Sequence, residues 1–424
     1  MDRFPAGSGA SSPSNFTNVN GIIFFVATTT AEGKELWKTN GTLGGTALVE
    51  DIRPGANGSF PANLTNVGGR LYFTASNGVA GAELWKSDGS SAGTTLVKDI
   101  VVGSGTSKPG RFANVNGILY FVAQTPGEGI ELWKSNGTSS GTVLVKDIRV
   151  GVDDSNPGSL TNVKGKLFFT ANDGVTGSEL WQSDGTAAGT VLVKDIQPGA
   201  ASSALSNFAN VKGILFFSAN DGTNGIELWK STGTLANTVL VKDIRVGPLS
   251  SNPTQLTNLK GNLMFAANDG VAGIELWTSN GSSAGTALIK DINPGAASSS
   301  PSFLTNLGGT LMFAATDGAT GIELHRSNGA AAGTVLVMDI RPGATGSVPQ
   351  GLLNLNGTLF FTAADGATGR ELWKSGIFGS TTALVADINP GAGGSNPASL
   401  TEGGASFLVF SANDGINGLE LWTL

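Results

Sequence analysis

The sequence contains no cysteine and a single histidine, and these two shortages exclude several kinds of functional site. Without cysteine, neither a disulfide framework nor a cysteine-type zinc cluster can form. His325 is the only histidine, so the sequence offers almost no candidates for a catalytic site in which a histidine activates a nucleophile. Charged residues make up only 13% of the chain, the net charge is -7, and no basic block is present. Nucleic acid and anionic membrane surfaces are therefore not expected as partners.

Long apolar segments are also lacking. The longest are of the kind found at residues 21–27, far short of the roughly 20 residues that span a membrane as a helix. The first residues, Met1 to Pro5, carry neither a basic nor an apolar leader, so we interpret the sequence as a part excised from a longer protein. The absence of cysteine is compatible with an extracytoplasmic life, and we expect an extracellular or cell-surface location.

What the sequence does contain is one unit repeated nine times. The triplet Glu-Leu-Trp, varied once to Glu-Leu-His, recurs at steps of 48 residues and once at a step of 49. A second marker, Asp-Ile, keeps the same period but occurs only eight times. The glutamates are Glu35, Glu83, Glu131, Glu179, Glu227, Glu275, Glu323, Glu371 and Glu420, and the aspartates are Asp51, Asp99, Asp147, Asp195, Asp243, Asp291, Asp339 and Asp387.

Each unit has the pattern of four short strands, as the fourth copy shows. Short runs rich in β-branched and aromatic residues favour strands over helices. Asn-Asp-Gly and Ser-Asp-Gly separate them, and such sequences suit tight turns because they tolerate positive φ. Both faces of the second strand are apolar, which indicates a sheet buried on both sides. The expected strands of this copy are residues 160–163, 166–171, 178–182 and 190–196.

A four-stranded antiparallel meander with one longer crossover per repeat predicts an all-β fold, a β-propeller of nine blades in a single domain, 1–424. A solenoid fits less well, because the terminal copies resemble the middle ones instead of being polar caps. The expected blades are approximately 1–52, 53–100, 101–148, 149–196, 197–244, 245–292, 293–340, 341–388 and 389–424.

The ninth copy ends before its fourth strand, so we expect the last blade to lack its outer strand. Residues 2–4 resemble only the tail of an Asp-Ile strand, too short to complete that blade. The sequence therefore predicts an imperfectly closed ring in a monomer, with an exposed edge that could pair with another chain. Nine blades exceed the usual four to eight, which leaves an eight-bladed ring with one displaced unit as the alternative.

The string Glu-Leu-Trp-Lys-Ser-Asp-Gly at residues 83–89 resembles the bacterial ELWxxDGT repeat family, and the resemblance extends over all nine units. It implies a propeller-like repeat in large secreted or surface-associated bacterial proteins, mostly without an assigned activity. The resemblance carries over no catalytic or binding residue. The pattern departs at His325, which replaces tryptophan, and at residues 375–378, which replace the Ser-Asp-Gly-Thr turn.

The repeated polar and aromatic residues are interpreted as structural. A catalytic carboxylate pair needs two different environments, whereas repetition places every Glu in the same one. A buried Glu needs donors, for which we expect backbone N–H groups or a threonine of the neighbouring blade. We expect Asp of Asp-Ile to close the outer strand or cap the crossover. Mid-strand tryptophan beside leucine is typical of core, although a sugar-binding platform is the other possibility; the tryptophans are Trp37, Trp85, Trp133, Trp181, Trp229, Trp277, Trp373 and Trp422.

Catalytic, cofactor and metal sites are not expected. Asp and Asn interchange at the turn after the third strand, which suits a positive-φ turn but not a hard cation that needs several carboxylates. His325 stands at a tryptophan position and is interpreted as a core replacement. Glycine-rich stretches lie in crossovers without a following helix, so they offer no phosphate cradle.

Two groups of residues remain as candidate sites. Ile377 and Phe378 bring apolar bulk into a turn that is polar elsewhere, so they either form a contact patch or pack over the blade edge. First-strand asparagines are expected to approach a central channel as a ring of amides that Glu402 interrupts, where they either bind a ligand or satisfy backbone groups. These residues are Asn18, Asn66, Asn114, Asn162, Asn210, Asn258, Asn306, Asn354 and Glu402.

The sequence favours a non-enzymatic scaffold or protein-binding module of a secreted or surface bacterial protein, with an unidentified protein or glycan as partner. A multivalent glycan-binding lectin with sites between blades is the alternative. A hydrolase or lyase acting at the channel would need clustered acidic or basic residues, for which the sequence offers only Glu402, Asp153, Asp154 and scattered loop charges.

Overall fold

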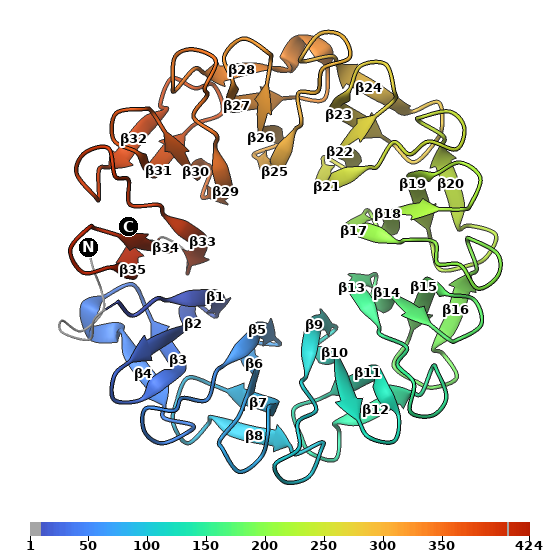
Figure 1. Ribbon diagram of the computed structural model, residues 1–424, viewed down its shortest axis with the longest axis vertical. Helices are drawn as coiled ribbons and strands as arrows, with labels where there is room; N and C mark the ends of the chain where they lie inside the picture. Colours follow the sequence, from blue (N-terminus) through green and yellow to red (C-terminus); the bar gives the residue numbers. More distant parts are fainter. Residues whose placement is uncertain (1–9, 405–406) are drawn as a thin grey trace. The chain divides into compact units, whose positions relative to one another are not determined.

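The fold is all-β, a β-propeller of nine blades (Figure 1). A computed structural model describes residues 10–404 and 407–424. Eight sheets have four antiparallel strands in chain order, and the ninth has three. The predicted nine blades and the missing outer strand of the last blade are therefore confirmed, and the eight-bladed alternative is wrong.

The strands of the first five blades have the following bounds. They are β1 Ser14–Val19, β2 Ile22–Thr29, β3 Gly33–Thr39, β4 Ala47–Glu50; β5 Ala62–Val67, β6 Arg70–Ala75, β7 Glu83–Ser87, β8 Thr95–Lys98; β9 Gly110–Val115, β10 Ile118–Thr125, β11 Gly129–Ser135, β12 Val143–Lys146; β13 Gly158–Val163, β14 Lys166–Asn172, β15 Ser178–Ser183, β16 Val191–Lys194; β17 Ser206–Val211, β18 Ile214–Asn220, β19 Ile226–Ser231 and β20 Val239–Lys242.

The last four blades follow the same order. Their strands are β21 Thr254–Leu259, β22 Asn262–Asn268, β23 Ile274–Ser279, β24 Thr286–Lys290; β25 Ser302–Leu307, β26 Thr310–Thr316, β27 Ile322–Ser327, β28 Val335–Met338; β29 Gln350–Leu355, β30 Thr358–Ala364, β31 Arg370–Ser375, β32 Ala383–Ala386; β33 Ala398–Gly403, β34 Phe407–Asn413 and β35 Leu419–Thr423. Two short 3₁₀ turns, Leu43–Gly45 and Ala331–Gly333, lie between third and fourth strands. No helix in the described residues is long and apolar enough to span a membrane.

The chain divides into two compact units. The first comprises Met1–Val175, Trp181–Val191 and Ala398–Leu424, and the second comprises Thr176–Leu180 and Leu192–Pro397. The first unit thus contains blades one to three and nine, the second contains blades five to eight, and residues of blade four belong to both.

The core lies between consecutive blades, because both faces of each second strand are apolar. In the second unit, Phe216 of β18 faces Leu263 and Phe265 of β22, and Trp277 of β23 joins the same buried cluster. The first unit repeats this arrangement with Tyr72 against Leu119 and Phe121. Burial of a large apolar side chain contributes about 1.5–3 kcal/mol, so these seams supply much of the stability. The prediction of a sheet buried on both faces is confirmed.

The fourth strands are shorter than the sequence indicates. The fourth blade was expected to have a strand over residues 190–196, but β16 ends at Lys194. The chain leaves the strand there because the N–H of Ile196 donates to the Glu179 carboxylate at 2.8 Å instead of continuing the strand ladder. The same contact ends the fourth strand elsewhere, for instance from Ile148 to Glu131 at 3.1 Å.

Each first strand is entered through a left-handed backbone residue. In every copy a serine is followed by a non-glycine residue with φ between 45° and 54°, as in Lys108 at 45° and Phe60 at 54°. Proline comes next in eight of nine copies, with Leu205 as the exception. A second left-handed residue follows inside the first strand, where the pairing with the second strand shifts register. This Ser-x-Pro entry positions the contacts described below.

The first and last blades contact each other inside the first unit. Ile23, Phe25 and Trp37 of blade one form one buried cluster with Val409 and Leu421 of blade nine. Residues 2–4, interpreted as the tail of an Asp-Ile strand, lie outside the described residues. Pairing of the β35 edge with another chain stays a prediction.

Candidate functional site

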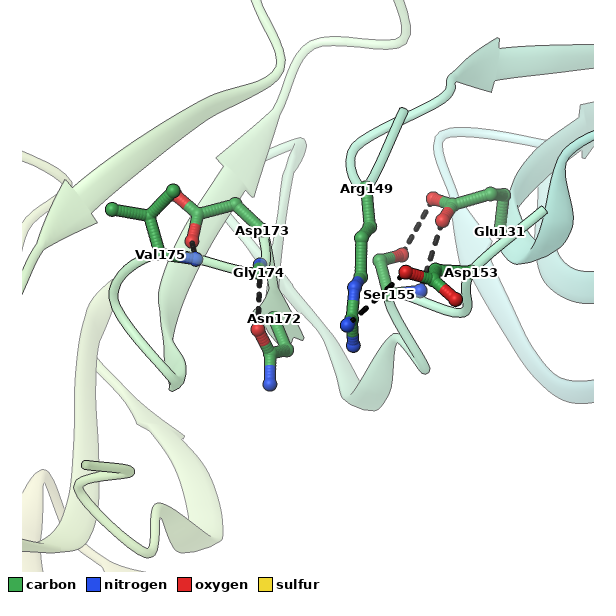
Figure 2. Close-up of polar contacts among 8 residues, drawn as sticks. All are labelled: Glu131, Arg149, Asp153, Ser155, Asn172, Asp173, Gly174 and Val175. Carbon is green, nitrogen blue, oxygen red and sulfur yellow. Dashed lines mark hydrogen bonds and ion pairs between the residues drawn. The ribbon is translucent and has the colours of Figure 1, made fainter. Parts of the chain in front are cut away.

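The repeated glutamate is buried in every blade and is held by a serine of the following crossover. In the third blade, Ser155 donates to Glu131 through its N–H at 2.9 Å and through its hydroxyl at 2.5 Å (Figure 2). The side chain of Glu131 is 0% exposed. These two hydrogen bonds, here called the Glu–Ser contact, match the expected structural role, but the hydroxyl comes from serine and not from threonine. The serines are Ser59, Ser107, Ser155, Ser203, Ser251, Ser299, Ser347 and Ser395, each 24 residues after its glutamate.

The same serine also reaches the next blade. Its carbonyl accepts the N–H of a residue that ends or follows the second strand there, as from Asn172 to Ser155 at 2.9 Å and from Asn220 to Ser203 at 2.7 Å. One residue thus joins the third strand of one blade to the second strand of the following one. The sequence signal was a serine recurring at a fixed spacing before x-Pro, hidden among the many serines of the crossovers.

The ninth glutamate uses a serine from the opposite end of the chain. Ser11 donates its N–H to Glu420 at 2.9 Å, and its hydroxyl donates to the same carboxylate. The N–H of Ser12 donates to the carbonyl of Leu419 at 3.0 Å, and that of Thr28 to the carbonyl of Ser11 at 2.9 Å. The Glu–Ser contact therefore connects the last blade to the first.

Burial raises the pKa of seven of these carboxyl groups above the usual value. Desolvation disfavours the ionised form and outweighs the hydrogen bonds from serine and from the backbone. The effect is largest for Glu179, whose pKa is raised to about 7. The seven are Glu35, Glu83, Glu131, Glu179, Glu227, Glu275 and Glu323.

The acidic pair of the third crossover is occupied by local contacts. Asp153 forms an ion pair with Arg149 at 3.3 Å, the one salt bridge between side chains of the described residues (Figure 2). Asp154 accepts the N–H of Ile130 at 2.7 Å, where other blades use a serine hydroxyl, such as Ser250 for Ile226. These two carboxylates therefore have separate partners.

Aspartate of the Asp-Ile marker caps the crossover turn, as one of the two expectations states. Its carboxylate accepts the N–H of a glycine four residues later, for example from Gly103 to Asp99 at 3.0 Å and from Gly247 to Asp243 at 3.1 Å. The glycine adopts positive φ, 88° at Gly103, which favours a residue without a Cβ.

The tryptophan side chains belong to the core between blades. They are 5–8% exposed in the seven of the first eight blades that carry one. The ammonium of Lys98 lies 5.9 Å from the centre of the Trp133 ring and donates to the carbonyl of Thr142 at 2.8 Å. Trp422 differs because its blade has no fourth strand: it is half-buried, and its indole N–H donates to Ala412 at 3.1 Å. The seven buried rings leave no stacking face for a sugar.

The first-strand asparagines form a ladder of backbone contacts. Asn66 donates its amide to the carbonyl of Asn18 at 3.0 Å, and its oxygen accepts the N–H of Gly69 at 3.0 Å. Asn18 in turn donates to the carbonyl of Glu402, whose own side chain is exposed. In the other seven asparagines the side-chain oxygen likewise accepts the N–H of the glycine three residues later. The amides therefore satisfy backbone groups. The glycines are Gly21, Gly117, Gly165, Gly213, Gly261, Gly309 and Gly357. Ligand binding by the predicted amide ring stays a prediction.

His325 and the residues of the turns after the third strands have structural roles. The His325 ring is buried, stacks at 5.8 Å on Phe313, and has its pKa lowered by that burial. In the turns after the third strand, Asp184 and Asn136 play the same role, each accepting the N–H and hydroxyl of a threonine two residues later. No group of three metal-ligating side chains occurs in the part of the chain that the structure describes.

The structure separates the two residues of the proposed contact patch. Ile377 packs against the buried cluster that joins the seventh and eighth blades. Phe378 is exposed, and the Arg326 guanidinium lies 5.0 Å from the centre of its ring. Only Phe378 is therefore available as a contact surface.

Highly exposed aliphatic side chains gather at one end of the blades. In a meander, the loop after strand two and the crossover after strand four lie at the same sheet end, and Arg149 of a crossover indeed lies against Gly174 of such a loop (Figure 2). Among the described residues, the aliphatic side chains more than 70% exposed all lie in these loops and crossovers: Val79, Val102, Val150, Val152, Val175, Val246, Val271 and Ile416.

No protein-family model matches the chain. No curated protein matches it either. Among solved structures it is similar to puromycin hydrolase, with 14% identity over 84% of this chain and 58% of that chain and a TM-score of 0.43. It is also similar to a prolyl endopeptidase (12%, 83% and 54%, TM-score 0.46) and to a puromycin-hydrolyzing peptidase of Mycobacterium tuberculosis (12%, 86% and 60%, TM-score 0.38). The chain thus spans little more than half the length of these structures, and likeness at this level says nothing about activity.

Proposed function

We propose that the chain is a non-enzymatic scaffold or protein-binding module of a secreted or surface bacterial protein. The bacterial and surface parts of this proposal rest on the resemblance to ELWxxDGT repeats, to which we assign the chain as part of the same proposal. The protein-binding part rests on the exposed aliphatic side chains of the loops and crossovers.

The exposed aliphatic side chains support protein binding on energetic grounds. An exposed valine leaves apolar surface in water at a cost of roughly 25 cal/mol per Å², so apolar residues grouped on one face indicate an interaction surface. In the first unit this surface includes Val150, Val152 and Val175, beside the Arg149–Asp153 ion pair. The repeated Glu, Asp and Asn side chains, by contrast, bond to the backbone and leave the loops as the variable part of the molecule.

Site-specific photocrosslinking tests the protein-binding function. The protein carrying a photoreactive residue at position 150 or 175 is incubated with the surface and secreted proteins of the encoding bacterium. Position 191 on β16 is the control, because Val191 is partly exposed but lies outside the loops. We expect a saturable adduct from positions 150 and 175 that the unlabelled protein competes away and a V150S/V152S/V175S variant does not. Equal adducts from position 191, or none that saturate, would contradict the proposal.

Two further readouts test the rest of the proposal. Protease added to intact cells should digest the tagged full-length protein, whereas protection until lysis would contradict a surface location.

The captured partner should remain chemically unchanged, because the proposal includes no catalysis. Cleavage or other conversion of the partner by the purified chain would contradict the non-enzymatic assignment.

A further inference from the structure

Grooves recur between consecutive blades at the end opposite to the crossovers. One lies between blades three and four and another between blades one and two, each with a volume of about 400 Å³. This is within the range of small-molecule sites. The first, here called the Tyr120 groove, is lined by Ile118, Tyr120, Lys134, Asn136, Gly141 and Val143 of the third blade and by Asp184 of the fourth.

The Tyr120 groove is lined by a phenol hydroxyl to which the described residues make no hydrogen bond. Tyr120 is 5% exposed, and its hydroxyl lies against Gly185 of the next blade. No residue in 10–404 or 407–424 forms a hydrogen bond with this hydroxyl, which is accessible from the groove. The equivalent position of the groove between blades one and two is Phe24, which has no polar atom. Burial raises the pKa of Tyr120, with a further contribution from the charge of Asp184.

Donors and acceptors surround this hydroxyl without a net charge. The Lys134 ammonium donates to the carbonyl of Gly185 at 2.8 Å and has further protons to donate. One oxygen of Asp184 accepts from Thr186, which leaves the other as an acceptor. The amide nitrogen of Asn136 is a further donor, since its oxygen binds the turn. Lysine and aspartate carry opposite charges, so the groove favours neither a free anion nor a free cation.

We propose that the Tyr120 groove binds a neutral polyhydroxylated ligand of monosaccharide size. Sugar hydroxyls both donate and accept, which matches the mixed polar lining, and the C–H face of a sugar fits against Ile118 and Val143. A ligand hydroxyl that reaches Tyr120 would form a hydrogen bond with the phenol hydroxyl in place of water. The site is independent of the buried tryptophans and of the loop surface at the opposite blade end, so it goes beyond the proposed protein-binding function.

Saturation-transfer NMR on the full chain tests the proposal. The probes are free glucose, galactose, mannose, fucose and N-acetylglucosamine, each at 10 mM, followed by titration of any sugar that binds. Tyr120→Phe is the decisive variant, because phenylalanine occupies the equivalent position in four other blades, and folding is therefore retained. Asp184→Asn is the second, since asparagine forms the same turn at Asn136. Asp88→Asn is the matched control in the groove between blades one and two, where Phe24 lies against Gly89.

The expected result is binding of at least one sugar, weakened at least tenfold by Tyr120→Phe and by Asp184→Asn and unchanged by Asp88→Asn. Absence of binding for all five sugars would overturn the proposal. Equal binding by Tyr120→Phe would also overturn it, because the sugar would then lie elsewhere. Inorganic phosphate at 10 mM should not displace the sugar, and displacement would show an anion site instead.

Discussion

At the scale of the residue, one serine per repeat determines how blades are joined. The hydroxyl and N–H of Ser155 bond to Glu131, while its carbonyl accepts from Asn172 of the next blade. Removal of such a donor leaves a buried carboxylate that is under-solvated, and the cost of this is larger than that of a neutral hydrogen bond. Substitution of this serine is also constrained by the backbone, because the residue directly after it adopts a left-handed conformation.

Ser155→Ala is expected to destabilise the protein by about 2 kcal/mol, because a buried carboxyl group loses a hydrogen-bond partner. Urea unfolding followed by tryptophan fluorescence measures the change. Ser91→Ala, an exposed serine in a turn, is the control and should stay within about 0.5 kcal/mol of the parent protein. Equal effects of the two substitutions would show that the Glu131 contact contributes little.

Val348 is expected to be a strained residue. Its φ is 51°, a left-handed conformation that a β-branched residue adopts only at a cost of about 1–2 kcal/mol. Asparagine tolerates this conformation and stands at the same position as Asn156, Asn252 and Asn396. Val348→Asn should therefore raise the free energy of unfolding by about 1 kcal/mol. Val152→Asn, in a crossover without this constraint, should give no such gain in the same denaturation experiment.

At the scale of the element, hydrophobic pattern and turn chemistry predict most of the fold. Alternation of Leu167, Phe168 and Phe169 indicates a strand buried on both faces, and the repeat period gives the number of blades. The Ser-x-Pro entry was not predicted, because composition does not distinguish Ser155 from the other serines of a crossover. The end of β16 at Lys194 was missed for a related reason: β-propensity continues to Ile196, but its N–H bonds to a glutamate 17 residues earlier in the chain. The unpartnered Tyr120 hydroxyl depends on the neighbouring blade and has no local signal.

Ser11→Ala is expected to loosen the contact between β35 and the first blade. The Ser11–Glu420 hydrogen bonds join residues 409 positions apart, so they hold two segments that the chain itself does not keep together. Amide hydrogen exchange should become faster in β35 and at Thr28, with β11 unchanged. Faster exchange across the whole chain, or none at β35, would contradict a local role.

At the scale of the whole molecule, the buried glutamates set the response to pH. The unfolded carboxyl groups titrate near 4.5, whereas the pKa of each of the seven shifted ones is higher in the folded protein, about 7 for Glu179. Below 4.5 this stabilising contribution is fully present, and it is lost as the pH rises through the folded values, because the unfolded chain releases its protons first. Hydrogen bonds lower the pKa of Asp88 and Asp184 below the unfolded value of 3.8. The stability that these two carboxylates contribute is therefore present above pH 3.8 and is lost as the pH falls through their folded pKa values.

The thermal midpoint should therefore be higher at pH 5 than at pH 8 and should decrease again below about pH 4. Calorimetry at constant ionic strength measures it. Glu179→Gln should reduce the slope between pH 5 and 8, because it removes the group with the largest shift. A midpoint that increases steadily from pH 5 to 8 would show that the glutamates remain ionised in the folded protein.

The Glu–Ser contact also bears on how such a gene changes in length. Its two partners are always 24 residues apart, and the asparagine contacts span 48, so each partnership is defined by distance along the chain and not by absolute position. Unequal recombination that inserts or deletes one whole 48-residue segment gives every remaining glutamate a serine at the correct spacing. Ser11 and Glu420 are the exception, since they are 409 residues apart and their spacing changes with the number of repeats. Variation in repeat number thus requires no compensating substitution, whereas a shift of a single codon inside a repeat would break the pairing at once.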